Sequence, residues 1–186
     1  MNQLIRTLAA LSTLTAFSLA GSAARADETV TIDGVHICCK GCAVAIEKAV
    51  AKTAEDKEHP AEVKCAVDSD AGKVELVAAD TAAIQAAVDQ IAAAGFHGKL
   101  SSKEVKWPKA KAPKGKVTSL EVTAVHNCCG ACTKAIKAAL AECEGVTADT
   151  CKPKEESFVI EGDFDAKAAL KALHKAGFHA SLPEKK

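Results

Sequence analysis

The chain has 186 residues, with 24 basic and 24 acidic side chains and a hydrophobic fraction of 48%. A balanced charge of this kind argues against a broad nucleic-acid-binding surface. The chain also has nine cysteines, six of them in two short segments. Sulfur chemistry is therefore the first function class to consider.

Residues 1–26 are predicted to form a signal peptide. Arg6 precedes an apolar run over residues 8–20, and Ala24-Arg25-Ala26 is a small-x-small cleavage site. The run is too short to favour a membrane span, although an uncleaved anchor is the alternative. We therefore expect a periplasmic or secreted chain that starts at residue 27, with 22 basic and 24 acidic residues and no stable membrane insertion.

The first half of the mature chain predicts six elements. Periodicity and turn residues indicate a strand over 29–32, a helix from near Gly41, strands over 63–67 and 73–77, a helix from Asp80 to Gly95, and a short strand from Phe96. Asp80 is a good N-cap, and Gly95 is a typical helix stop. The order is strand, helix, strand, strand, helix, strand.

The second half repeats this pattern. A strand is expected over 119–125, a helix carrying Ile136 and Leu140, a helix from Asp165 to Gly177, and a short strand from Phe178. The predicted fold class is therefore α+β, as two tandem ferredoxin-like βαββαβ sandwiches. We expect the first domain over 27–101 and the second over 118–186.

Between these domains, residues 102–117 are rich in lysine and proline. Proline and like-charge repulsion both extend a chain, so this segment is predicted to be a semi-rigid linker. The alternative is a docking segment for an acidic partner or a membrane surface, with Trp107 as an anchor.

The pattern HxCCxxC occurs twice, 90 residues apart, at the junction between the first strand and first helix of each copy. Its members are His36, Cys38, Cys39, Cys42, His126, Cys128, Cys129 and Cys132. Thiolate is the metal-binding form of cysteine, and the free amides of a helix N-terminus lower a thiol pKa. The two loops are therefore predicted to bind a soft metal ion.

Gly34-Val35-His36-Ile37-Cys38-Cys39-Lys40-Gly41-Cys42, opening the first helix of a βαββαβ unit, resembles the heavy-metal-associated domain. That family includes copper chaperones, N-terminal modules of copper-transporting ATPases and periplasmic mercury-binding proteins. The resemblance implies that Cys39 with Cys42, and Cys129 with Cys132, are the metal-binding pairs. It also implies that the Gly-Phe turns at 95–96 and 177–178 lie near a metal loop.

The loops depart from the family pattern in several ways. Each loop adds a cysteine and a histidine and lacks the family's frequent methionine, and the second copy also lacks the loop glycine. A bare CxxC suits two-coordinate Cu(I), whereas three thiols and an imidazole could complete a tetrahedral Zn(II) site. Cys38 and Cys128 could instead be small buried hydrophobes, or members of a vicinal disulfide.

Other histidines and cysteines have weaker signals. His97 and His179 recur after the Gly-Phe turns and could be outer-shell partners or capping ligands, whereas His59 and His174 are expected at the surface. Three further cysteines lie outside the loops. Cys143 and Cys151 could form a local disulfide, and Cys65 is expected in the core.

The leading function is a non-enzymatic metal-binding protein that captures, buffers or transfers a soft metal ion. Cu(I) is favoured, with Zn(II) or Hg(II) as alternatives, and the expected partner is a metal-transporting ATPase or another metal-transfer protein. A periplasmic thiol-disulfide oxidoreductase is the second reading, because a CxxC at a helix N-terminus also serves that chemistry. A regulatory or partner-binding module is a third.

Overall fold

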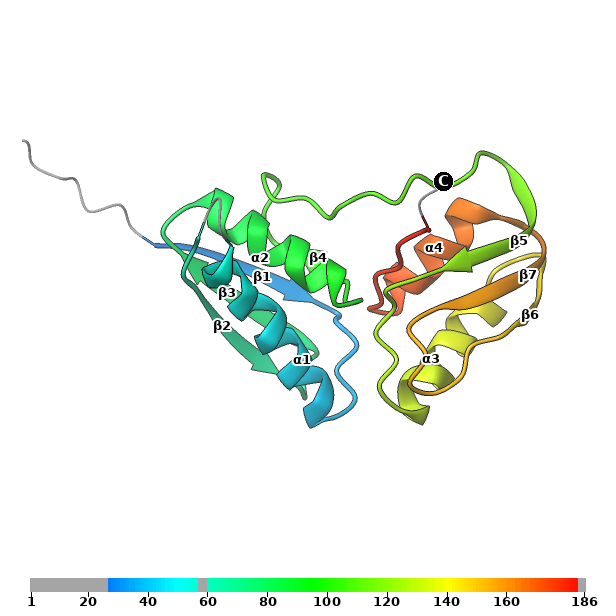
Figure 1. Ribbon diagram of the computed structural model, residues 1–186, viewed down its shortest axis with the longest axis horizontal. Helices are drawn as coiled ribbons and strands as arrows, with labels where there is room; N and C mark the ends of the chain where they lie inside the picture. Colours follow the sequence, from blue (N-terminus) through cyan, green and yellow to red (C-terminus); the bar gives the residue numbers. More distant parts are fainter. Residues whose placement is uncertain (1–26, 57–59, 184–186) are drawn as a thin grey trace, which may run out of the picture.

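The computed structural model describes residues 27–56 and 60–183, and it has two α+β modules side by side (Figure 1). The predicted signal peptide and His59 lie outside the described residues. An extended segment leads from β4 of the first module to β5 of the second (Figure 1). The limits expected for each domain stay predictions.

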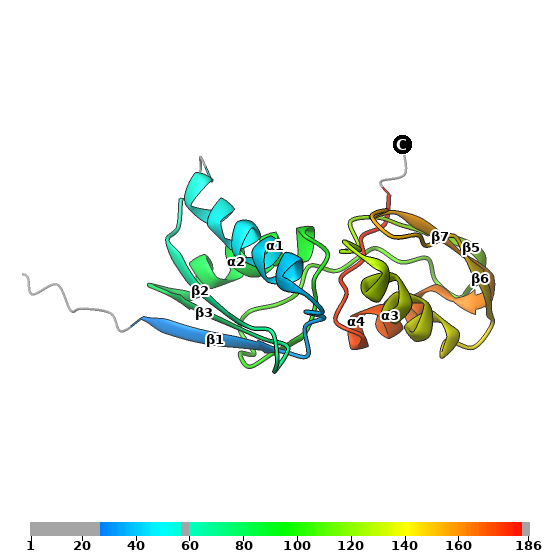
Figure 2. The same cartoon turned by 90° about the horizontal axis from the view of Figure 1, so that it is seen from below.

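The first module has the predicted element order. Its elements are β1 (Glu28–Asp33), α1 (Lys40–Ala51), the 3-10 helix η1 (Lys52–Glu55), β2 (Val63–Asp68), β3 (Lys73–Ala78), α2 (Thr81–Ala93) and β4 (Lys99–Leu100). The sheet order is β2-β3-β1-β4, with β1 antiparallel to both of its neighbours. This is the ferredoxin-like arrangement, with α1 and α2 on one face of the sheet (Figure 2).

The second module is a shorter version of the first. Its elements are β5 (Lys116–Val122), α3 (Gly130–Ala141), β6 (Val146–Asp149), β7 (Phe158–Asp165) and α4 (Ala166–Lys175). Its sheet order is β5-β7-β6. The fourth strand is reduced to one bridge between Thr123 and Ser181.

The helix limits follow the residues that predicted them. Asp80 caps α2, its carboxylate accepting a hydrogen bond from the Ala83 amide at 2.9 Å, and Asp165 caps α4 through Ala168 at the same distance. The large, fully buried side chains of the two modules belong to one continuous hydrophobic core. These are Ile32, Ile46, Leu76, Ile84, Ile91 and Phe96 in the first module, and Ile136, Leu140, Ile160, Phe164, Leu173 and Phe178 in the second.

The expectation that final strands begin at Phe96 and Phe178 is wrong. These two residues instead form an antiparallel bridge with each other across the modules. The His97 amide donates to the Gly177 carbonyl at 3.0 Å, and the His179 amide donates to the Gly95 carbonyl at 2.9 Å. Backbone groups that were expected to extend each module's own sheet therefore join the two modules, in a pseudo-twofold arrangement.

The segment after β4 packs on the first module. The indole Nε1 of Trp107 donates to the Gly98 carbonyl at 2.8 Å, and the Gln85 side chain makes two hydrogen bonds to the backbone of Lys106. Among the described residues, no helix combines the length and apolar character that a membrane crossing requires.

Candidate metal centre

The two cysteine loops face each other in the middle of the molecule (Figures 1 and 2). Cys39 is the N-cap residue of α1, and Cys129 is the N-cap residue of α3. Cys42 and Cys132, one turn into each helix, are fully buried, whereas Cys38 is exposed. The β-to-α junctions thus present all six loop sulfurs to a common space.

The six sulfurs form two triangles. In the first, the Sγ atoms of Cys39, Cys42 and Cys128 are 3.8 Å apart on every side. In the second, Cys129, Cys132 and Cys38 are 3.5 to 3.9 Å apart. Contacts from Cys38 to Cys42 at 3.7 Å and from Cys128 to Cys132 at 3.8 Å link the triangles. Each triangle contains the CxxC pair of one loop and one sulfur from the other loop. Cys38 and Cys128, the cysteines that precede the CxxC pairs, therefore each join the pair of the other module.

The sulfurs differ in acidity. The backbone amides of Cys132 and then Ala131 lower the pKa of Cys129 to about 6, and the amide of Cys42 is the main cause of a lowered pKa at Cys39. Loss of hydration, followed by hydrogen bonding to neighbouring thiols, raises the pKa of Cys38. The Cys128 pKa is raised for the same reasons. Since metals bind thiolates, filling the site must release protons.

The loop histidines also point toward this space. The buried Nε2 atoms of His36 and His126 have no hydrogen-bond partner. A His126 nitrogen lies within 4.8 Å of the sulfurs of Cys42, Cys128 and Cys132, and a His36 nitrogen lies within that distance of Cys38 and Cys132. Burial lowers the pKa of both imidazoles, to about 4 at His126. Neutral imidazoles are therefore available beside the thiols.

The second module matches a known protein family. Residues 122–179 match the sequence model of the heavy-metal-associated domain. This segment is a heavy-metal-associated domain. Domains of this family bind metal ions, which agrees with the sulfur cluster at its edge. No curated protein is significantly similar to the chain.

A solved structure that is similar to this chain is the solution structure of the N-terminal soluble domains of Bacillus subtilis CopA. It is 18% identical, covers 86% of this chain and 95% of that chain, and has a TM-score of 0.31. The family assignment rests on the sequence match of residues 122–179 and not on this superposition.

In the heavy-metal-associated domain, the Gly-Phe turn does contact a cysteine loop, but that loop belongs to the other module. The Phe178 ring lies 4.5 Å from the His36 ring, between centroids. In the same way, the Phe96 ring stacks on His126 at 4.1 Å. The sequence predicted that each Gly-Phe turn lies near a cysteine loop. No local pattern indicated that this loop would belong to the other module.

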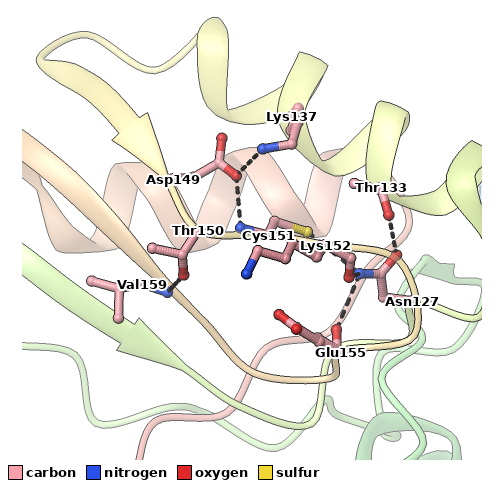
Figure 3. A network of polar contacts seen from close by, with 9 residues as sticks. All are labelled: Asn127, Thr133, Lys137, Asp149, Thr150, Cys151, Lys152, Glu155 and Val159. Carbon is pink, nitrogen blue, oxygen red and sulfur yellow. Dashed lines mark hydrogen bonds and ion pairs between the residues drawn. The ribbon is translucent and has the colours of Figure 1, made fainter.

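Asn127, which sequence reasoning missed, holds the second loop (Figure 3). Its buried Nδ2 atom donates to the carbonyls of Lys152 and Glu155 at 2.6 and 3.0 Å and contacts the Cys151 sulfur at 3.4 Å. Its Oδ1 atom accepts a hydrogen bond from the Thr133 hydroxyl at 2.8 Å. The side chain thus ties the loop between His126 and Cys128 to α3 and to the segment before β7.

We expect Asn127→Ala to lower the free energy of unfolding of the heavy-metal-associated domain by about 2 kcal/mol or more, because two carbonyls lose their buried donor. Urea unfolding followed by circular dichroism measures the change. Lys152→Ala is the matched control, since Lys152 takes part through its carbonyl and its side chain is exposed. Equal stability of the two variants would contradict the assigned role.

The other predicted residues have different surroundings. Cys143 and Cys151 are buried free thiols, so the local disulfide that they could form is not present in this structure. Cys65, on the edge strand β2, is half-buried and packs against the hydrophobic core. His174 was expected at the surface, and this expectation is wrong. Its ring stacks on the ring of His97 across the modules, with the centroids 4.1 Å apart.

Proposed function

We propose that the protein captures and buffers a soft metal ion, Cu(I) in preference to Zn(II) or Hg(II), at one centre built by both cysteine loops. The first module would then be a second heavy-metal-associated domain that uses Cys39 and Cys42. The observation that carries this proposal is the pair of three-sulfur triangles, each containing sulfurs from both modules.

The size of the triangles supports metal binding. The centre of a triangle with 3.8 Å sides is about 2.2 Å from each corner, close to the ~2.3 Å of a metal–thiolate bond. Three thiolates form a soft site that suits Cu(I) or Zn(II), and the three-coordinate geometry favours Cu(I), because Zn(II) is normally tetrahedral with four ligands. Each triangle can therefore take one Cu(I) with little movement of the sulfurs, which gives at least two ions per chain.

Release would proceed by ligand exchange. A thiolate of the acceptor binds the metal ion as one cysteine ligand leaves, and Cys38, the exposed thiol, is the ligand that would leave first. Three thiols hold an ion more tightly than two, which favours buffering over fast transfer. The acceptor is a metal-transporting ATPase or another metal-transfer protein.

The signal peptide expected over residues 1–26 supports a periplasmic or secreted site of action. In that compartment thiols are exposed to oxidation. A disulfide between Cys39 and Cys42 would abolish binding, so metal loading or a reducing partner must keep the loops functional.

Anaerobic titration of the fully reduced protein with Cu(I), followed by native mass spectrometry, tests the proposal. We expect at least two Cu(I) ions per chain that resist a competing chelator, because each triangle supplies three thiolates. Insulin reduction is assayed in parallel with the same preparation.

Two results would overturn the proposal. One is a reduced chain that retains no Cu(I) against the chelator. The other is substantial insulin reduction by the metal-free chain, which would favour the oxidoreductase reading. Replacing all six loop cysteines by serine is the control, and this variant must lose Cu(I) uptake.

A further inference from the structure

A second group of potential ligands lies across the module interface, outside the cysteine loops. It consists of His97 from the first module and His174 and His179 from the second, each offering a ring nitrogen within 4.8 Å of the other two. His97 and His179 follow the bridge between Phe96 and Phe178, whereas His174 lies in the last turn of α4. Neither module has this group without the other.

The three imidazoles have unused polar atoms. Nδ1 of His97, Nε2 of His174 and Nδ1 of His179 are buried and have no hydrogen-bond partner. Buried polar atoms are normally paired, so three such nitrogens in one cluster call for a ligand.

The surroundings favour a neutral cluster with limited access. Burial, followed by the charges of the other two histidines, lowers the pKa of His97 to about 3. The Trp107 ring covers His97, with ring centroids 4.5 Å apart. His179 also lines a cleft between α2, the linker at Pro108 and Pro113, and the second module. The cleft thus extends from solvent to one of the three histidines.

We propose that His97, His174 and His179 form a separate site for a borderline divalent cation, with Zn²⁺ as the best fit. Three neutral imidazoles with an open fourth position are a typical Zn²⁺ donor set, whereas Cu(I) prefers the thiol centre. The rings of His97 and His174 are now stacked, with an interplanar angle of 4°. Nitrogens on one tetrahedral Zn²⁺ are about 3.4 Å apart, so the rings must turn inward when the ion binds.

A bound ion at this position would join the two modules directly, because His97 belongs to one and the other two ligands belong to the second. The proposal does not depend on metal binding by the cysteines. It assigns to the interface an ion that joins the two modules, whereas the cysteine loops would bind the ion that the protein carries.

The test uses the full chain after its thiols have been filled with Cu(I), so that added Zn²⁺ meets only the imidazole site. Native mass spectrometry and calorimetric titration should show one Zn²⁺ per chain. His97→Gln and His174→Gln, one from each module, should each weaken that binding at least 100-fold. Lys171→Gln is the matched control, because Lys171 is an exposed residue on the same helix as His174.

A second measurement identifies the donors. The variant with serine at all six loop cysteines is titrated with Co²⁺, and we expect visible ligand-field bands without thiolate charge-transfer absorption. Zn²⁺ binding that is unchanged in both histidine variants would overturn the proposal, as would the absence of Zn²⁺ binding to the Cu(I)-loaded chain. Failure of Cu(I) binding in the separate titration of the parent protein would overturn only the proposed function.

Discussion

The double variant Cys38→Ser/Cys129→Ser is expected to keep one tight Cu(I) site. Cys38 and Cys129 belong to the same triangle, so their loss leaves Cys39, Cys42 and Cys128 intact. Cys38→Ser/Cys39→Ser should keep none, because these neighbours in sequence serve different triangles. Loss of one ligand should weaken its triangle at least 100-fold, more than the 10- to 100-fold typical of changes around a metal site.

The two double variants remove the same number of thiols, so each is the control for the other. Cu(I) retained against a chelator, counted by native mass spectrometry, measures the outcome. If each additional cysteine served the CxxC pair of its own loop, the counts would be reversed, with one tight site in Cys38→Ser/Cys39→Ser and none in Cys38→Ser/Cys129→Ser. That reversal would contradict the exchanged arrangement.

Gly95→Ala is expected to separate the two modules. A Cβ atom at this position would lie 2.1 Å from the backbone nitrogen of His126 and 2.7 Å from the Ala124 carbonyl oxygen. Neither backbone group can move away without opening the interface. Small-angle X-ray scattering should therefore show a larger radius of gyration, and Cu(I) should be held only by the separate CxxC pairs, with a weaker affinity.

Gly115→Ala is the matched control for this change. Both glycines have a positive φ, +85° at Gly95 and +80° at Gly115, so alanine adds a similar backbone strain of about 1–2 kcal/mol at either site. An added Cβ at Gly115 meets no atom within 4 Å. If both variants keep the compact shape and the Cu(I) affinity of the parent, the interface described here does not hold the modules together.

Most secondary structure was predictable because it depends on local patterns. The alternation over residues 29–32 and the caps at Asp80 and Asp165 each act within a few residues, and the structure has β1, α2 and α4 at these places. The starting residues of the terminal strands were mispredicted for the opposite reason. Phe96 and Phe178 have strand-like sequence contexts, but the choice of a pairing partner depends on how the modules dock.

The candidate site also has features that follow from local sequence and features that follow only from the docking of the modules. The repeated loops identified the six thiols and two histidines, because thiols at a helix N-terminus are a local feature. Asn127 had no such signal, since its partners Lys152 and Glu155 are brought to it only by folding. His174 was predicted at the surface because its role requires His97, which belongs to the other module.

By itself, the sequence predicted which side chains would bind a metal ion and that two similar α+β units carry them, because periodicity, caps and loop residues act over short distances. The tertiary structure alone decided that Cys38 joins the pair formed by Cys129 and Cys132, and that Cys128 joins Cys39 and Cys42. The physical reason is the docking of the two modules. Contacts between residues about 90 positions apart depend on how closely the two surfaces fit, for which neither copy of the repeat has a local pattern.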